Sequence, residues 1–478
     1  MSEIIDTDVC VIGAGSGGLS VAAGASQMGA RTVLIEKGAM GGDCLNFGCV
    51  PSKALLAAGG AAQGARDAGR FGLAAMSPSV DMARVRAHVR GVIAAIEPND
   101  SQERFEGLGV TVIRAAARFT GPTEVAAGDK RVRAKYFVIA TGSSPFVPPI
   151  PGLDAVPHFT NETLFDIDRA VEHLIVIGGG PIGLEMAQAH RRLGARVTVL
   201  EAARLLGKDD PEAAAVVIER LGAEGIDLRE GAKVTGVAAR GEAGVAVTVE
   251  TADGGVETIE GSDLLVAVGR VANVEGLGLD AAGIAYDRRG IAVDRHLRTS
   301  ARRVFAIGDA AGGWQFTHMA GYHAGVVIRQ MLFKMLWAKT DDTAVPWVTY
   351  TDPELAQVGL TEAAAVERFG ADGVKILRWS FEENDRAQAE RDTHGFVKAI
   401  LDRKGRVLGA TLVGAHAGEL LLPWALAVQE RIKIAKLAGV IAPYPTRSEA
   451  TKRAAGSAFT QTLFSERTRK IVRFLLRF

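Results

Sequence analysis

The feature that most constrains this chain is a strand, a glycine-rich turn, a helix and a second strand, which together end on the acidic residue Glu36. Glycine occupies three positions of the turn, where it lets the backbone approach a pyrophosphate at the helix N-terminus. Glu36 can accept hydrogen bonds from ribose hydroxyls. The pattern predicts a dinucleotide-binding α/β unit at the start of the chain, with the glycines Gly13, Gly15 and Gly18.

The same pattern occurs a second time further along the chain, where the second strand ends on Glu201. An acid at this place can hydrogen-bond a free adenosine 2′-hydroxyl but repels a 2′-phosphate, which favours NADH. Arg204, three residues later, keeps NADPH open. The two units amount to an internal duplication with one site for each dinucleotide, and the second site is predicted at Gly178, Gly180 and Gly183.

Two cysteines lie between these units, in the stretch Gly41-Gly42-Asp43-Cys44-Leu45-Asn46-Phe47-Gly48-Cys49-Val50-Pro51-Ser52-Lys53. Such a pair can close a small disulfide ring or open to two thiols. We expect a short loop that leads into a helix capped by Ser52, a setting that lowers a thiol pKa. The alternatives are a structural disulfide or a zinc half-site, although zinc needs about four ligands and only Cys10 remains. Because a dithiol needs a two-electron carrier beside it, we expect FAD in the first site.

The cysteine stretch resembles the redox-disulfide signature of the class I, FAD-dependent pyridine nucleotide-disulfide oxidoreductases, the family of dihydrolipoamide dehydrogenase, glutathione reductase and mercuric reductase. The resemblance implies an α/β fold with two Rossmann-like dinucleotide-binding domains, one for FAD and one for NAD(P)H, and a C-terminal α+β dimerisation domain. It also implies that Cys49 makes a charge-transfer contact with the flavin and that Cys44 exchanges with substrate. Lys53 is expected to pair with Glu185 near the flavin, the alternative for Glu185 being a helix-surface carboxylate.

Three further segments resemble parts of this family. The segment 304–310 resembles the second FAD signature, in which Asp309 can bind the ribityl hydroxyls, and a helix that begins near Phe316 can point its N-terminus at the isoalloxazine. The turn Ala140-Thr141-Gly142 resembles one that closes under the FAD in relatives. The pair Gly269-Arg270 resembles the family's return from the NAD domain to the FAD domain. The cofactor-binding residues predicted in these parts and in the cysteine stretch are Gly42, Lys53, Thr141, Gly142, Gly269, Asp309 and Thr317.

The domain order follows from these segments and from a proline-rich linker near residue 150. We predict the first part of an FAD-binding domain at 1–150, an NAD(P)H-binding domain at 151–270, the second FAD part at 271–345 and a dimerisation domain with a basic tail at 346–478. The segment 350–362 resembles the start of the family's dimerisation domain, which completes the partner's active site. We therefore expect an obligate homodimer.

The chain departs from the disulfide reductases at Tyr444-Pro445-Thr446-Arg447-Ser448-Glu449, where their His-Pro-Thr-x-x-Glu motif has the acid/base histidine. Tyrosine titrates near 10 and histidine near 6.5, so tyrosine is the poorer base, and loss of a positioned base costs roughly 10² to 10⁴ in rate. Tyr444 with Glu449 is predicted to act as acid or hydrogen-bond donor in the partner's site. Mercuric reductases have a tyrosine here, but this chain lacks their C-terminal cysteine pair.

Composition narrows the range of partners and locations. The formal net charge is zero, so no nucleic acid is expected as a partner. Three cysteines, two of them in one redox motif, favour the reducing cytoplasm, and no run of about 18 apolar residues could span a membrane. No resident metal is expected. The basic, apolar segment 470–478 predicts an amphipathic helix that lies on an anionic membrane or, as is commoner, packs on its own protein.

These predictions converge on a homodimeric flavoenzyme in which NAD(P)H reduces FAD, FAD reduces the Cys44–Cys49 disulfide, and the thiols reduce a disulfide, a thiol adduct or a metal acceptor. The first alternative is a dihydrolipoamide dehydrogenase that tolerates Tyr444. A second is a flavin-only diaphorase or NADH oxidase in which the disulfide is a spectator. A third is a redox-sensing, membrane-docked partner protein without turnover.

Overall fold

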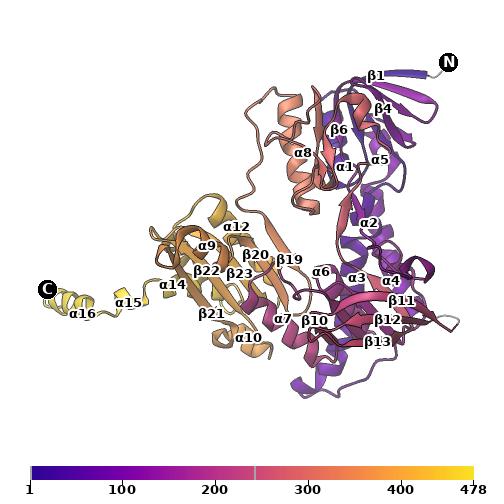
Figure 1. Cartoon of the computed structure of the whole chain (residues 1–478). Coiled ribbons are helices and arrows are strands. Elements are labelled where there is room, and N and C mark those ends of the chain that lie inside the picture. The colour runs from indigo at the N-terminus through magenta and orange to yellow at the C-terminus, as the bar shows by residue number, and fades with distance from the viewer. Residues whose placement is uncertain (1–2, 242–243) are drawn as a thin grey trace.

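The computed structural model describes residues 3–241 and 244–478, which form three parts, each built on a sheet (Figure 1). The first part has a seven-stranded sheet in the order β3-β2-β1-β6-β5-β4, with β18 beside β6. Strands β3, β2, β1, β6 and β18 are parallel to one another, while β5 is antiparallel to both β6 and β4. The bounds are β1 Glu3–Ile12, β2 Thr32–Glu36, β3 Val110–Arg114, β4 Ala117–Gly121, β5 Glu124–Ala127, β6 Lys130–Ile139 and β18 Val304–Ala306.

This sheet is covered on both faces because side chains alternate along its buried strands. Val9 and Val11 of β1 pack in one core with α1 (Ser16–Gln27), α5 (Gln102–Gly107) and α8 (Thr317–Met331). Cys10 and Ile12 point into a second core on the opposite face. Cys10 is fully buried there, and burial raises the pKa of its thiol far above the usual range. The third cysteine therefore takes no part in the redox pair.

The second dinucleotide unit is a four-stranded parallel sheet in the order β10-β9-β8-β14, joined by the antiparallel sheet β11-β12-β13. Helix α3 packs on α6, and a Cβ at Gly59 of α3 would lie 3.3 Å from Ala189 Cα of α6. The helix that carries the cysteines is thereby held against the second unit. The bounds are α3 Cys49–Asp67, α4 Met82–Ile96, β8 His173–Ile177, α6 Pro181–Arg192, β9 Arg196–Glu201, α7 Pro211–Ala223, β10 Asp227–Glu230, β11 Lys233–Arg240, β12 Gly244–Glu250, β13 Val256–Gly261 and β14 Asp263–Val266.

The third part is a five-stranded antiparallel sheet in the order β19-β20-β23-β22-β21. Lys398 of β22 is 4% exposed, and its Nζ lies 3.0 Å from Asp210 Oδ2, 2.8 Å from Glu212 Oε2 and 2.9 Å from Glu362 Oε2. This cluster ties the N-terminus of α7 to the sheet. The bounds are β19 Pro346–Thr349, β20 Glu354–Gly359, α9 Glu362–Phe369, β21 Val374–Ser380, α10 Asp385–Ala389, β22 Phe396–Asp402, β23 Val407–Gly414, α11 Ala417–Leu420, α12 Leu422–Gln429, α13 Ile434–Ala438 and α14 Glu449–Ser457.

The chain passes between the first two parts through a two-stranded antiparallel ribbon of β7 (Ser143–Pro145) and β15 (Arg270–Ala272). A short hairpin of β16 (Tyr286–Asp287) and β17 (Gly290–Ile291) lies further along the first part. The α/β class, the two parallel sheets and the separate C-terminal sheet agree with the predicted fold. None of the helices in the described residues is both long and apolar enough to cross a bilayer.

The structure corrects two local predictions about the cysteine stretch. Cys44 lies in the short helix α2 (Gly42–Asn46), not in a loop, and α3 begins at Cys49 with Gly48 as its N-cap. Ser52 is therefore inside the first turn of α3, where its Oγ lies 3.2 Å from the Cys49 carbonyl oxygen. Gly41, with φ +85°, is the N-cap of α2, and Gly48 is the N-cap of α3, so the two helices follow each other closely. Ser52 lies too far along the chain to cap the second helix.

The prediction that the C-terminal helix packs on its own protein is wrong for the described chain. Helix α15 (Thr460–Leu463) and helix α16 (Glu466–Leu475) extend away from the third part, and no residue of either is buried (Figure 1). The amphipathic pattern forms a helix, as predicted, but none of its apolar side chains is buried against residues 3–241 or 244–478.

Candidate active site

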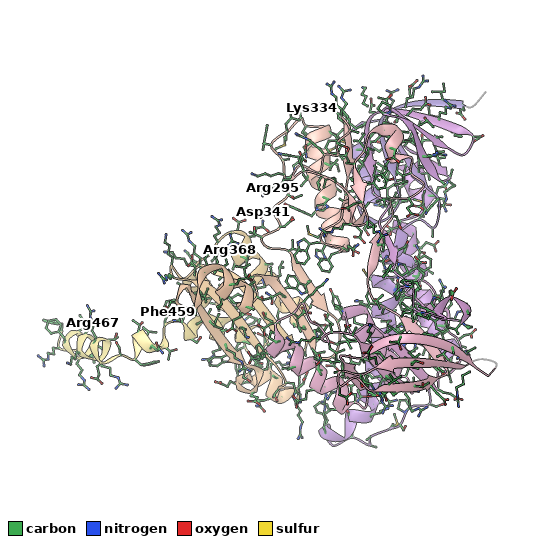
Figure 2. All side chains as sticks on the ribbon, in the orientation of Figure 1. Arg295, Lys334, Asp341, Arg368, Phe459 and Arg467 are labelled. Atoms are coloured by element: carbon green, nitrogen blue, oxygen red, sulfur yellow. The ribbon has the colours of Figure 1, made fainter. Side chains whose placement is uncertain are left out.

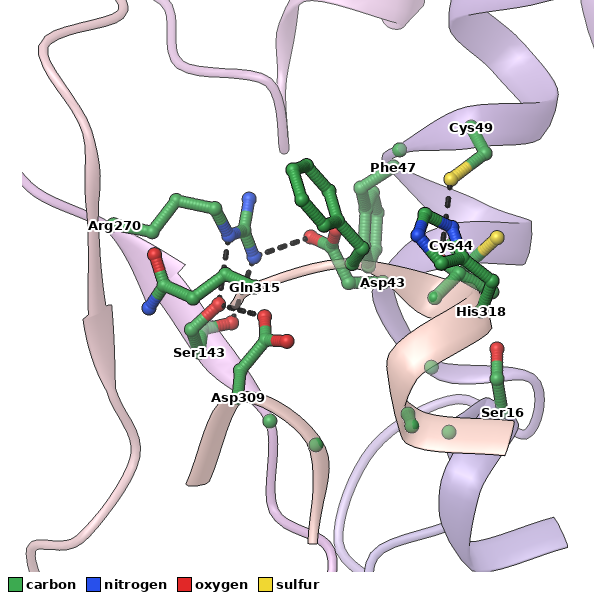
Figure 3. Close-up of a pocket in the computed structure, with 18 of the residues that line it drawn as sticks. Ser16, Asp43, Cys44, Phe47, Cys49, Ser143, Arg270, Asp309, Gln315 and His318 are labelled. Carbon is green, nitrogen blue, oxygen red and sulfur yellow. Dashed lines mark hydrogen bonds and ion pairs between the residues drawn. The ribbon is translucent and has the colours of Figure 1, made fainter. Parts of the chain in front are cut away.

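A cavity of about 660 Å³ lies where the three parts meet (Figure 3). It brings together most of the site residues predicted in the first unit, and Glu185 from the second. Those that line it are Gly13, Gly15, Glu36, Gly42, Cys44, Cys49, Lys53, Thr141, Gly142, Glu185, Asp309 and Thr317. Those that lie outside its lining are Gly18, Gly178, Gly180, Gly183, Glu201, Gly269, Tyr444 and Glu449.

The glycine turn of the first unit fits a nucleotide because its walls are bare backbone. Gly13 has φ +104°, and a Cβ there would lie 2.4 Å from the Ala140 carbonyl oxygen. A Cβ at Gly42 would lie 2.7 Å from Gly15 Cα. Glu36 accepts the Ala14 N–H at 2.6 Å, so its carboxylate stands beside this turn. A cradle without side chains at a helix N-terminus suits the pyrophosphate and ribose of FAD.

The second glycine turn repeats this arrangement, outside the cavity. A Cβ at Gly178 would lie 2.4 Å from the Ala267 carbonyl oxygen, and one at Gly183 would lie 2.0 Å from the Gly178 carbonyl oxygen. Glu201 accepts the Gly179 N–H at 2.8 Å, as Glu36 does in the first unit. The two units therefore have the same construction. The glycines of the second turn do not line the cavity that contains the cysteines, but Pro181 and Ile182 of that turn do.

The two thiols lie in adjacent helices, Cys44 within α2 and Cys49 at the start of α3, and they differ in pKa. Cys49 Sγ lies 3.3 Å from Thr317 Oγ1, at the N-terminus of α8. The pKa of Cys49 is lowered to about 6, mainly by the hydrogen bond from Cys44. The hydrogen bond with Thr317 and the positive charge of Lys53 lower it further, whereas burial opposes the shift. The hydrogen bond between the two thiols, with burial, raises the pKa of Cys44 far above the usual range. The reduced pair thus shares one proton, with the negative charge on Cys49.

The reduced protein is expected to show a single thiolate titration, because Cys10 and Cys44 both have raised pKa values. The thiolate absorbance of Cys49 should be present above pH 6 and be lost as the pH falls through about 6. Thr317→Val, which removes the hydroxyl that contacts Cys49, should move this midpoint to higher pH. Ultraviolet absorbance of the thiolate against pH measures both, and a wild-type midpoint near 9 would contradict the assignment.

Lys53 and Glu185 form the ion pair that the resemblance implies. Lys53 Nζ lies 2.8 Å from Glu185 Oε2, and the Glu185 side chain is 6% exposed. The Tyr350 N–H donates to Glu185 Oε1 at 3.0 Å, and Lys53 Nζ lies 4.2 Å from the centre of the Tyr350 ring. The surface-carboxylate alternative for Glu185 is therefore wrong. The pair holds a positive charge at the cavity wall within reach of the Cys49 thiolate.

Lys53→Met is expected to lower the free energy of unfolding by about 1 to 3 kcal/mol, because the buried Glu185 carboxylate keeps only the Tyr350 N–H. The lower half of that range is expected, since the Lys53 side chain is 38% exposed. Arg31→Met, which breaks the exposed pair with Asp8, is the matched control and should destabilise the protein less than Lys53→Met does. Urea unfolding of the three proteins makes the comparison, and equal losses would contradict a buried pair.

A polar network that the sequence did not predict also lines the cavity (Figure 3). Arg270 donates from Nε to Ser143 Oγ at 2.7 Å, and its Nη2 lies 3.0 Å from Asp43 Oδ1. Ser143 Oγ in turn donates to Asp309 Oδ2 at 2.5 Å. Burial raises the pKa of Asp309. In the sequence, Gly269 and Arg270 mark the return to the FAD domain, but no local pattern indicates that Arg270 contacts the cysteine stretch.

Tyr444 and Glu449 do not reach the cavity of their own subunit. The Tyr444 side chain is 71% exposed, and its hydroxyl donates to Asp385 Oδ2 at 3.0 Å. This hydrogen bond raises the pKa of Tyr444, which makes it a still poorer base. No hydrogen bond links Tyr444 to Glu449 in the described residues. A contribution to the partner's site remains a prediction.

Comparison with known proteins supports the same chemistry. The family profile for pyridine nucleotide-disulphide oxidoreductases matches residues 7–324, and the profile of the family's dimerisation domain matches residues 345–455, which supports a homodimer. The mercuric reductase of Streptomyces lividans is 36% identical over 456 residues, covering 94% of this chain and 95% of that protein. Dihydrolipoyl dehydrogenase 3 of Pseudomonas aeruginosa is 37% identical over 470 residues, covering 94% and 97%.

Solved structures agree with these matches. The Cu(II) complex of the HOCl-induced flavoprotein disulfide reductase RclA from Escherichia coli superimposes with a TM-score of 0.83 at 28% identity, covering 93% of this chain and 99% of that one. Fold, cavity and relatives give one answer: the chain belongs to the class I pyridine nucleotide-disulfide oxidoreductases, a family of NAD(P)H–FAD–disulfide oxidoreductases.

Proposed function

We propose that this protein is a reductase that uses NADH in preference to NADPH and delivers electrons through Cys44 and Cys49 to a thiophilic acceptor, either a soft metal ion bound as thiolates or a disulfide of low thiol pKa. The observation that carries the proposal is the Cys49 thiolate in a cavity shared with the glycine cradle and with Lys53. When bound, FAD supplies the two-electron link between nicotinamide and sulfur.

The two cysteines divide the work. When the proton of the pair passes from Cys44 to Cys49, the Cys44 thiolate can attack the acceptor. For an acceptor disulfide, attack forms a mixed disulfide and releases one thiolate. Cys49, as thiolate, then attacks Cys44, closes the Cys44–Cys49 bond and releases the second. Before this attack the proton of Cys49 passes to the first released thiolate, and solvent supplies a proton to the second. The acceptor thus gains two electrons, and the pair is oxidised to its disulfide.

The preference for NADH rests on Glu201. Its carboxylate accepts both the Gly179 N–H and the Ala203 N–H at 2.8 Å, which fixes a negative charge at the end of β9 where a 2′-phosphate would lie. Arg204, three residues after Glu201 in the chain, favours the phosphate.

The tyrosine at position 444 favours an acceptor that reaches the site without a thiol proton to be removed. A dihydrolipoamide substrate enters as two thiols and requires a base, whereas a metal thiolate or a disulfide does not. The hydroxyl of Tyr444 already donates to Asp385, and its pKa is raised. The choice rests on the tyrosine, because the chain is about equally similar to a mercuric reductase, at 36% identity, and to a dihydrolipoyl dehydrogenase, at 37%.

Tyr444→His is expected to increase dihydrolipoamide oxidation by roughly 10²-fold and to leave disulfide reduction within a few-fold of wild type, because only the first reaction gains a base. NADH-linked turnover should be compared across lipoamide, glutathione disulfide, an aromatic disulfide, Hg²⁺ and Cu²⁺ presented as thiolates, and a quinone. Fast dihydrolipoamide oxidation by the wild type would instead support a dihydrolipoamide dehydrogenase, and Tyr444→Phe is the control for a change of side chain without a base.

A further inference from the structure

The C-terminal segment 466–478 presents an apolar surface that has no partner among the described residues. Helix α16 carries no buried residue, and the last residues continue it as turns, with the Leu476 N–H donating to the Val472 carbonyl oxygen at 2.9 Å. Phe474 is 57% exposed, Leu475 60% and Phe478 96%. In Figure 2 the chain leaves the third part near Phe459, which packs on its core, and the helix that carries Arg467 stands clear of the side chains of that part.

The segment has two chemically distinct faces. At about 3.6 residues per turn, Arg469, Arg473 and Lys470 fall on one side of the helix, and Arg477 continues that side. The opposite side is apolar and aromatic, and the Phe474 and Phe478 rings pack edge to face with centroids 5.5 Å apart. The apolar residues of this side are Ile471, Val472, Phe474, Leu475 and Phe478, with Arg467 at its first turn, and Leu476 lies at the border with the basic side.

Charge distinguishes this segment from an ordinary subunit contact. It contains five basic residues and one acid, Glu466, whereas the whole chain has a formal net charge of zero. It also lies beyond the dimerisation-domain match, which ends at residue 455. A concentration of positive charge along an apolar stripe complements a surface that is anionic outside and apolar beneath, as a phospholipid bilayer is.

We propose that segment 466–478 binds the surface of anionic phospholipid membranes. The helix lies in the plane of the interface, with Phe474, Leu475 and Phe478 below the headgroups and the arginines among them. A homodimer presents two such segments, which raises the effective affinity when both reach one bilayer. The proposal is independent of the acceptor, because no residue of the segment lines the active-site cavity.

The test uses the full-length, FAD-loaded protein in sedimentation with vesicles of phosphatidylcholine and of an equimolar mixture with phosphatidylglycerol. Wild type should pellet with the anionic vesicles and stay in solution with the neutral ones. Arg473→Gln/Arg477→Gln should weaken binding about 30-fold, since each basic residue near an anionic surface contributes about fivefold. Phe474→Ser/Phe478→Ser should weaken it about 100-fold or more, because two buried aromatic side chains are lost.

Arg288→Gln/Arg289→Gln is the matched control, since it removes two exposed arginines from the β16–β17 turn and should bind vesicles as wild type does. Sedimentation velocity and NADH-linked turnover of each variant report whether dimer and active site are intact. Equal pelleting on both vesicle types, or binding unchanged in both tail variants, would overturn the proposal. So would dissociation of the dimer by Phe474→Ser/Phe478→Ser without vesicle binding by wild type, which would assign the segment to a second copy of the chain.

Discussion

Cys44→Ser is expected to lower NADH-linked reduction of the thiophilic acceptor by roughly 10³-fold or more, because a serine hydroxyl cannot form the mixed disulfide or the ring with Cys49. Helix α2 should keep its fold, since serine is nearly isosteric and Cys44 is only partly buried. FAD content should be unchanged because the glycine cradle is untouched. The Cys49 pKa should rise from about 6, because the hydrogen bond from Cys44 is the first of its causes.

The control for Cys44→Ser is Cys10→Ala, which removes a thiol from the far core of the first sheet and should leave acceptor reduction as in wild type. A second readout is electron transfer from NADH to ferricyanide, which takes electrons from a flavin directly and should persist in Cys44→Ser. If Cys44→Ser reduced the physiological acceptor as fast as wild type, the disulfide would be a spectator and the diaphorase alternative would be correct.

Gly18→Ala and Gly183→Ala are expected to separate the two cofactors. A Cβ at Gly18 would lie 1.8 Å from the Gly13 carbonyl oxygen, and one at Gly183 would lie 2.0 Å from the Gly178 carbonyl oxygen. Real contacts of this kind exceed 3 Å, so each substitution must push its helix away from its strand. Gly18→Ala should yield protein with little or no FAD, whereas Gly183→Ala should keep FAD and lose at least roughly tenfold in apparent affinity for NADH.

The matched control for these substitutions is Gly64→Ala, at a helical glycine of α3 where an added Cβ meets nothing within 4 Å. It should bind both cofactors normally and stabilise the protein by about 0.5 to 1 kcal/mol, since alanine is the better helix former. Flavin absorbance per chain, NADH titration and thermal unfolding give the three readouts. Equal loss of FAD from the Gly18 and Gly183 variants would show that the two turns do not serve separate dinucleotides.

Most of the fold could be predicted from local patterns of residues, because each of these patterns depends on short-range steric effects. The glycine turns require φ values that other residues avoid, as at Gly13 and Gly178, and alternating or continuous apolar runs fix the strands that follow. The two dinucleotide-binding units were predicted from such patterns, whereas the separate C-terminal domain was implied by the resemblance. The wrong cap at Ser52 has the same origin, since serine favours N-caps in general, whereas here Gly48 occupies that position.

Long-range contacts were harder to predict, and they decide the chemistry. The sequence by itself determined two dinucleotide units, a cysteine pair beside a helix N-terminus, a tyrosine in place of a histidine, and a basic amphipathic end, because each is written in neighbouring residues. Only the tertiary structure decided that Thr317 faces Cys49, that Arg270 reaches Asp43, and that the last helix has no residue buried against the described part of the chain. These depend on how distant segments pack, and packing is a property of the whole chain that no local pattern of residues contains.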